Sequence, residues 1–323
     1  MQMSASARIK WIDYAKGVAI FLMVIGHTSL PAMLGKWIWS FHMPLFFVIS
    51  GLLFCSERYP QFWGFCRKRI WSLLVPYICF TIICAGLDWW LDLFTADNKH
   101  PFSWGWDGVA LWFLPVLFCC EIIYYWLSKL GKAFSLIAVV ALSLFGYWLY
   151  REGVHLPYKA EVIPFAMLFY GIGNVFQAEI RNFKSPWWLG LVLLAMSVAL
   201  SIVLPKLDMA HNCYGVYYLN IPNALLGTAA MLCLCQQIEK FSRTAAMDVL
   251  KRTLSWLGKN TLPILCLSQT LSLLLRRVLE FVSMPGALRH GLNFVLMWVL
   301  LVLVTIAIQK YAPILFGKRS TKR

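Results

Sequence analysis

Long apolar stretches separated by short polar segments run through the whole sequence. A helix of about 20 apolar residues crosses the hydrocarbon core of a bilayer, and ten stretches of roughly that length carry few charges. Two of them contain Pro164 and Pro263, which a membrane helix tolerates where neighbouring helices satisfy the freed carbonyl groups. The pattern predicts an all-α polytopic membrane protein of about ten transmembrane helices, formed by a single domain over residues 1–323. The predicted helices lie at 17–34, 37–54, 70–94, 109–127, 133–150, 160–177, 186–205, 214–237, 258–275 and 290–311.

The composition supports this prediction and excludes a soluble domain. Of the 323 residues, 60% are apolar and 13% are charged, whereas globular chains are about 45–50% apolar and about 25% charged. Ten spans with short connections also leave no length for a separate soluble domain. We therefore expect an integral membrane protein whose partners include membrane lipid, and the sequence leaves its oligomeric state open.

The formal net charge is +15, and nucleic-acid binding, anionic lipid and membrane topology each produce basic chains. If the ten helices alternate in direction, 21 of the 29 lysines and arginines fall on the side that holds both termini. This is the positive-inside pattern, so both termini are predicted to be cytoplasmic. Because topology accounts for the charge, no nucleic-acid partner is expected. No cysteine or histidine spacing is typical of zinc, so no metal is expected either.

Three ionisable residues stand out inside the predicted helices: His27, His42 and Glu121. A charge at the centre of a membrane helix costs about 2.5–3.5 kcal/mol, so each is a candidate functional residue. His27 lies about ten residues into the first helix, roughly 15 Å, and Glu121 about twelve residues into the fourth, so both are expected near the midplane. The first two helices are antiparallel neighbours, so the two histidines are expected to share a cavity. Together the three groups suit acid/base chemistry, whereas each histidine alone is equally compatible with a hydrogen bond to a neighbouring helix.

A basic cluster, Arg67, Lys68 and Arg69, begins the third predicted helix on the inner side. One interpretation is a topology determinant whose side chains reach lipid phosphates, and the spacing alone favours it. The other is a binding site for a phosphorylated cytosolic cosubstrate, to which arginine presents a planar, permanently charged fork.

Several motifs occur in order along nearly the whole chain. The first fifty residues carry WIDYAKG at 11–17, GH at 26–27 and SFHMPLFFVISG at 40–51; RKR at 67–69 leads to VPY at 75–77, LWFLP lies at 111–115 and LGKNTL at 257–262. Together these motifs resemble the membrane acyltransferase-3 family, in its fucose 4-O-acetylase-like branch. The resemblance implies an enzyme of the bacterial inner membrane. Such an enzyme moves an acetyl group from cytoplasmic acetyl-CoA to a sugar hydroxyl of a surface polysaccharide or of its lipid-linked precursor.

The resemblance and the chemistry of the side chains together assign three groups of candidate residues. The catalytic candidates are His27, His42 and Glu121; the candidates for binding the CoA donor are Lys16, Arg67, Lys68, Arg69 and Lys259; the candidates for binding the acceptor are Ser50, Trp112 and Asn260. His27 is expected to remove the proton from the acceptor alcohol, Glu121 to orient or charge-balance that histidine, and donors near Ser50 to stabilise the oxyanion.

Two positions depart from the pattern of many relatives. Lys16 stands where they have arginine, which keeps the charge but removes the bidentate fork. Ser268 stands where they have histidine, so His27 and His42 carry more of the predicted chemistry. Intramembrane histidine and glutamate also build proton relays, so a proton-coupled transporter or a flippase of a glycolipid, without acyl chemistry, is the alternative function.

Overall fold

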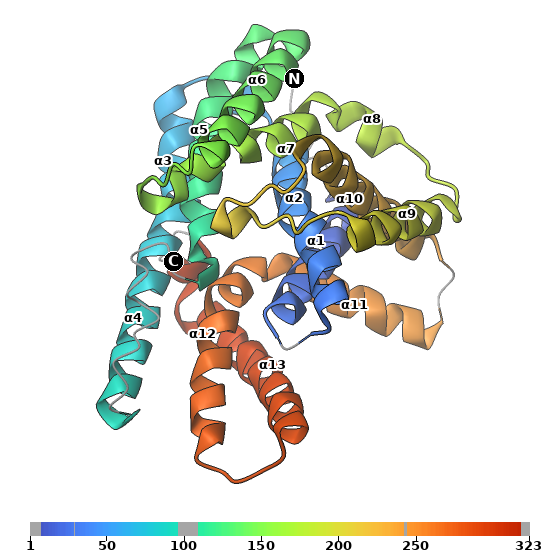
Figure 1. Cartoon of the computed structure of the whole chain (residues 1–323). Helices are drawn as coiled ribbons and strands as arrows, with labels where there is room; N and C mark the ends of the chain where they lie inside the picture. The colour runs from blue at the N-terminus through green and yellow to red at the C-terminus, as the bar shows by residue number, and fades with distance from the viewer. Residues whose placement is uncertain (1–7, 29, 96–108, 242–243, 318–323) are drawn as a thin grey trace.

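The computed structural model describes residues 8–28, 30–95, 109–241 and 244–317, and most of this part of the chain is α-helical (Figure 1). The predicted all-α class is confirmed: the described residues form no β-strand, and one isolated bridge pairs Asp208 with Cys213. The helices are α1 (Lys10–Gly26), α2 (Ala32–Leu53), α3 (Phe62–Arg69), α4 (Val75–Thr95), α5 (Phe113–Leu127), α6 (Lys132–Arg151), α7 (Ile163–Val175), α8 (Gln177–Asn182), α9 (Leu189–Val203), α10 (Tyr217–Lys240), α11 (Ala245–Lys259), α12 (Thr261–Glu280) and α13 (Gly286–Tyr311).

Seven helical segments of the described chain are long and apolar enough to cross a membrane, which is fewer than the ten predicted. The difference comes from three predicted spans that contain shorter helices: α1 has 17 residues, α7 has 13 and α9 has 15. Most residues of α1 and α7 are buried. Because these two helices pack mainly against protein, their ends are not exposed to the hydrocarbon core. Each can therefore be shorter than a helix that crosses the bilayer in contact with lipid.

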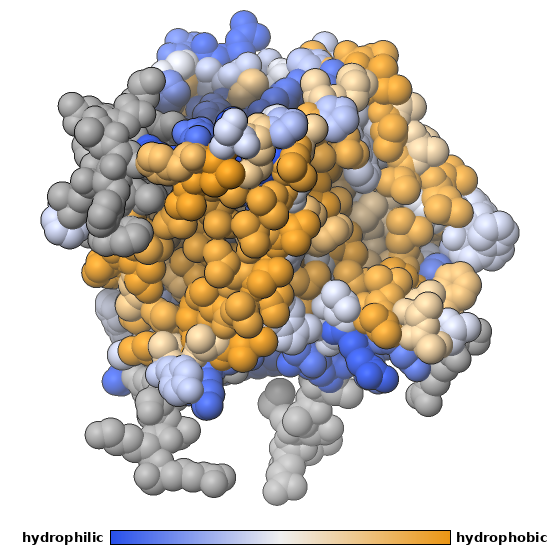
Figure 2. All heavy atoms as spheres, turned by 90° about the horizontal axis from the view of Figure 1, so that it is seen from below, coloured by the Kyte–Doolittle hydropathy of each residue, from blue (hydrophilic) through white to orange (hydrophobic). Residues whose placement is uncertain are grey.

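The outer surface carries the apolar residues that remain exposed. Figure 2 shows an apolar band between two hydrophilic rims, as expected where lipid tails face the middle of the molecule and headgroups face its edges. α13 contributes strongly to this surface, since only 22% of its apolar window is buried. Together with the number of apolar helices, this band identifies an integral membrane protein. Exposed apolar side chains include Phe134, Ile137, Leu191, Val203, Val295 and Leu303.

Close helix crossings hold the interior of the bundle together. α2 packs on α7, and α1 packs on α11. Glycine lies at each crossing: a Cβ atom at Gly173 of α7 would overlap the backbone oxygen of Val48, and one at Gly258 of α11 would overlap that of Asp13. Without a hydrophobic driving force between helices in lipid, such small residues allow the backbones to approach closely.

Replacing Gly173 by alanine is therefore expected to destabilise the protein, because the backbone atoms against the new methyl group cannot move aside. Overpacking of this kind costs about 1–3 kcal/mol, which we expect to appear as a lower melting temperature of the purified protein. The matched control is Gly86→Ala on α4, where nothing lies within 4 Å of the new Cβ atom. That change should leave the protein equally stable or slightly more stable. An equal loss in both variants would show that the crossing is not the cause.

Candidate active site

Two adjacent cavities contain most of the predicted site residues. The histidine cavity, of about 440 Å³, is lined by His27, Trp39, His42, Trp112, Lys206, His211 and Gln269, among others. The arginine cavity, of about 240 Å³, is lined by Lys16, Ser50, Arg69 and Glu121, with apolar residues of several helices. Leu265 of α12 lines both cavities, so the two cavities border the same side chain.

His27 lies at the end of a helix rather than in the middle of one. α1 ends at Gly26, and the backbone N–H of His27 bonds the carbonyl of Val24 at 3.2 Å. The predicted span began at residue 17, whereas the helix begins at Lys10, so His27 falls at its far end. The prediction that His27 lies deep within the first helix is therefore wrong. The expected shared cavity is observed, because His27 and His42 both line the histidine cavity.

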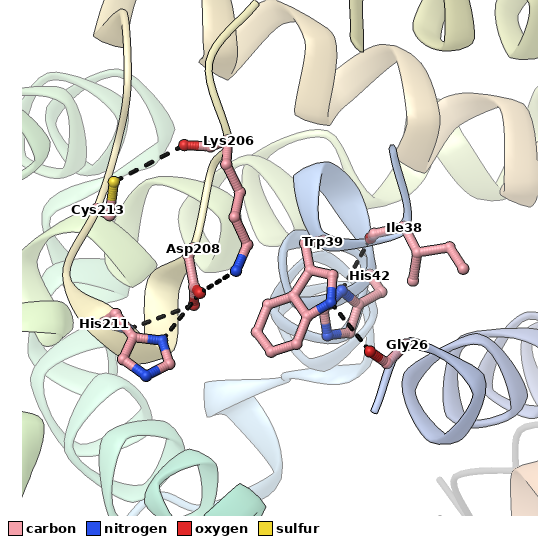
Figure 3. A network of polar contacts seen from close by, with 8 residues as sticks. All are labelled: Gly26, Ile38, Trp39, His42, Lys206, Asp208, His211 and Cys213. Atoms are coloured by element: carbon pink, nitrogen blue, oxygen red, sulfur yellow. Dashed lines mark hydrogen bonds and ion pairs between the residues drawn. The ribbon is translucent and has the colours of Figure 1, made fainter. Parts of the chain in front are cut away.

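The structure defines which ring nitrogen of His42 is free. Its Nδ1 lies 2.8 Å from the backbone oxygen of Ile38, one turn earlier in α2 (Figure 3). A carbonyl oxygen only accepts hydrogen bonds, so Nδ1 is the nitrogen that carries the proton. In the neutral ring, Nε2 then keeps its lone pair and can accept a proton or a hydrogen bond.

Trp39 connects the two histidines. Its ring makes edge contacts with His27 and His42, at centroid distances of 5.1 and 5.5 Å. Its Nε1 donates a hydrogen bond of 3.2 Å to the backbone oxygen of Gly26, which fixes the start of α2 against the end of α1 (Figure 3). Sequence analysis placed Trp39 among no candidate residues, because a tryptophan near a helix end is usually interfacial.

The loop before α10 supplies a second group of polar residues that sequence analysis missed. The buried carboxylate of Asp208 accepts a hydrogen bond from Lys206 Nζ at 2.7 Å and lies 2.9 Å from His211 Nδ1 (Figure 3). Lys206 Nζ also lies 4.3 Å from the centre of the Trp39 ring. Burial acts to raise the pKa of the Asp208 carboxyl, but the hydrogen bond from Lys206 and the charges of both neighbours hold that pKa below its ordinary value.

Replacing Asp208 by asparagine is expected to loosen this loop, because the charge that holds Lys206 and His211 is lost. Hydrogen bonds that involve a charged group contribute about 1.5–3 kcal/mol each. The lowered pKa means that this stabilisation is complete above the ordinary carboxyl pKa and is lost as the pH falls through the lowered pKa of the folded protein. Hydrogen exchange of a peptide covering 206–213 should be faster in the variant at neutral pH, and the difference should shrink in acid. The control is Glu152→Gln, which removes an exposed carboxylate. Identical exchange rates in the unchanged protein and in both variants would contradict the role of Asp208.

The arginine cavity is organised around an ion pair. Arg69 Nε and Glu121 Oε2 are 2.8 Å apart, and Glu121 is almost fully buried. Arg69 is the last residue of α3, where a π-helical turn, Ile70–Leu74, joins α3 to α4. Such wide turns are frequent at functional sites. The expected pairing of Glu121 with a histidine is not observed, since the arginine brought in by α3 takes that place.

The remaining candidates divide into those at a cavity and those outside it. Lys16 and Ser50 line the arginine cavity, but the Ser50 hydroxyl donates to the backbone oxygen of Phe46 at 2.8 Å and is thus already engaged. Trp112 lines the histidine cavity. Neither cavity is lined by the other four candidates, Arg67, Lys68, Lys259 and Asn260. The three basic side chains are exposed. Asn260 makes hydrogen bonds with Trp256 and Gln309 at the junction of α11 and α12.

Two neighbouring residues of α12, Ser268 and Gln269, have different surroundings. Ser268, at the position where relatives often have histidine, is buried and lies outside the lining of both cavities. Gln269, beside it, lines the histidine cavity. Among the described residues, no group of three histidine, cysteine or acidic side chains is close enough to hold a metal ion.

The fold and the two cavities define a helical membrane protein in which acid/base groups adjoin a buried cationic site. A family model described as an acyltransferase domain matches residues 9–308, nearly the whole chain. The chain therefore belongs to the acyltransferase-3 family and is a membrane acyltransferase. Neither a curated protein nor a solved structure matches it.

Proposed function

We propose that this acyltransferase moves an acetyl group from cytoplasmic acetyl-CoA to a sugar hydroxyl of a surface polysaccharide or of its lipid-linked precursor. We further propose that it acts in a bacterial inner membrane with both termini in the cytoplasm, as the fucose 4-O-acetylase-like branch implies. One observation carries the proposal: a cationic cavity suited to a thioester of CoA adjoins a cavity with two histidines suited to an alcohol, with Leu265 bordering both.

The arginine cavity suits the donor by charge and by size. Lys16 and Arg69 contribute two cations and Glu121 one anion, so the cavity keeps an excess of positive charge for the phosphates of CoA. Glu121 Oε2 pairs with Nε of Arg69, and a guanidinium carries four further N–H bonds that can donate to a phosphate. A cavity of about 240 Å³ holds the narrow thioester arm rather than the nucleotide. The exposed Arg67 and Lys68 would then meet the nucleotide at the cavity mouth.

The histidine cavity suits the acceptor. The sugar hydroxyl attacks the carbonyl carbon of the thioester as His27 takes the hydroxyl proton. A C–O bond forms, the C–S bond breaks, and CoA leaves as a thiolate that regains a proton, so the products are an acetyl ester and free CoA. His42 Nε2 accepts a hydrogen bond from a second hydroxyl and orients the sugar. Trp112 offers its ring to a sugar face in the same cavity.

The proposal predicts a change in the glycans of the cell. Surface glycans and lipid-linked precursors are compared by mass spectrometry in cells with and without the protein. We expect acetyl esters that disappear when the protein is removed and return when it is supplied again. The strain with the protein must first be shown to produce it in the membrane. Glycans of identical mass in the two strains would then refute the proposed acceptor class.

A further inference from the structure

A third cavity lies between α12, α13 and the end of α1. It has a volume of about 690 Å³, within the range of ligand pockets. We call it the hairpin groove, and its polar lining includes His27, Gln269, Ser272, Arg276, His290 and Asn293. α12 and α13 lie side by side in Figure 1 and pack against each other. Apart from His27, the proposed function gives no role to the residues that line this groove.

The hairpin groove is electropositive and contains buried acceptors. Arg276 and His290 are exposed and line it, and none of its described lining residues is acidic. The side-chain oxygens of Gln269 and Asn293 are buried without a hydrogen-bond partner, although Asn293 Nδ2 donates to Ser272 at 3.2 Å. A buried unpaired carbonyl oxygen is costly unless a ligand donates to it. The cationic side chains can bind an anionic group, and the two unpaired side-chain oxygens can accept hydrogen bonds from hydroxyls. The groove therefore suits a molecule that carries both.

The position of the basic residues is unusual for a membrane protein. The positive-inside rule leaves eight of the 29 lysines and arginines on the predicted outer side. Three of these eight, Arg276, Arg277 and Arg289, lie at the ends of α12 and α13 that meet at the turn. Topology does not explain a cluster of positive charge on this side, whereas recognition of an anion does.

The hairpin groove connects the lipid-facing surface to the proposed reaction centre. Its apolar lining includes Leu34, which is 41% exposed, and Phe294 of the lipid-facing α13. At its other end, His27 and Gln269 line both the groove and the histidine cavity. A lipid chain can therefore stay in the apolar part while the polar end reaches His27.

We propose that the hairpin groove binds the phosphate-bearing end of a lipid-linked sugar, which enters from the bilayer and presents its hydroxyl at His27. Arg276 and His290 bind the phosphate, and the amide oxygens of Asn293 and Gln269 accept hydrogen bonds from the sugar. The inference rests on the proposed function, since it names the class and the entry route of the acceptor.

The test measures binding without requiring acetyl transfer. A synthetic prenyl diphosphate N-acetylglucosamine with a diazirine in its lipid chain is photocrosslinked to the purified full-length protein in nanodiscs. Arg276→Gln is expected to weaken its apparent affinity about tenfold or more, as loss of a charged hydrogen-bond donor predicts. Arg276→Lys should restore part of the affinity. The matched control is Arg151→Gln, at the exposed end of α6 on the same predicted side, which lies outside both the cluster and the groove lining and should change the affinity less than about twofold.

Competitors define the ligand chemistry. The same prenyl diphosphate sugar without diazirine should displace the probe, whereas a prenyl-linked sugar without phosphate should compete weakly. Displacement by phosphatidylglycerol or by free pyrophosphate at the same concentration would overturn the proposal in favour of an ordinary lipid or a free anion. Unchanged binding by a folded Arg276→Gln variant would also overturn it. If the probe binds in the groove but no acetyl group is transferred, the proposed function is refuted and this inference is not. If acetyl transfer occurs but the affinity for the probe does not depend on Arg276, this inference is refuted and the proposed function is not.

Discussion

Replacing His27 by glutamine is expected to lower acetyl transfer by about 10²–10⁴-fold, the usual contribution of a general base. Glutamine retains hydrogen-bonding capacity but takes up no proton, so kcat should fall. The arginine cavity does not include His27, so the affinity for acetyl-CoA should be unchanged. Single-turnover transfer and equilibrium binding of labelled acetyl-CoA measure the two effects separately.

Two further histidine variants make this prediction specific. His42→Gln is expected to raise the KM for the acceptor as well as to lower kcat, because His42 Nε2 orients the sugar. His155→Gln is the control, since that side chain is exposed, lies outside the described linings of both cavities and is near Glu161. Normal transfer by inserted His27→Gln protein would show that His27 is not the base.

The second large effect concerns the ion pair in the arginine cavity. Arg69→Gln removes a donor to the CoA phosphates and leaves the buried Glu121 carboxylate unpaired, so the variant should lose both acetyl-CoA affinity and stability. Removing one partner of a buried pair costs about 3–5 kcal/mol. Glu121→Gln should lose stability but keep CoA affinity, because the arginine charge remains. Binding of labelled acetyl-CoA and melting temperature distinguish these outcomes.

The double variant Arg69→Gln/Glu121→Gln completes the comparison. Its stability should exceed that of Arg69→Gln alone, because no buried charge is left unpaired, while CoA affinity stays low. Stability losses that simply add would contradict the pairing, and unchanged CoA affinity in Arg69→Gln would leave this arginine a structural role only. Lys132→Gln, at an exposed position of α6, is the charge control, and it should leave both CoA affinity and melting temperature unchanged.

The apolar pattern predicted the fold class because lipid imposes it on every residue that faces the bilayer. The same pattern does not distinguish a helix surrounded by lipid from one surrounded by protein, since both are apolar on all sides. α1 and α7 are of the second kind: α1 begins and ends about seven residues earlier than predicted, and α7 is shorter than predicted. The end of α1 did have a local signal: Gly26, followed shortly by Pro31, is typical of a helix end and a turn.

The candidate site was predicted where residues are close in sequence or rare in membrane helices. His27 and His42 fell in one cavity because the helices that carry them are joined by a short turn. The partner of Glu121 was predicted wrongly, since Arg69 reaches it from a helix more than fifty residues away in sequence. The Asp208 loop was missed because aspartate, lysine and histidine in a loop are ordinary surface residues until tertiary packing buries them.

The central claim is that acetyl leaves CoA and enters a sugar ester at a site between two cavities. The most direct test gives purified protein in proteoliposomes acetyl-CoA labelled separately in the acetyl group and in the CoA part, together with a lipid-linked sugar. We expect that the acetyl label moves to the sugar, that free CoA appears in equal amount, and that His27→Gln lowers both by about 10²–10⁴-fold. Movement of sugar lipid or another solute across the membrane, with acetyl-CoA left intact, would contradict the account and support a transporter or flippase.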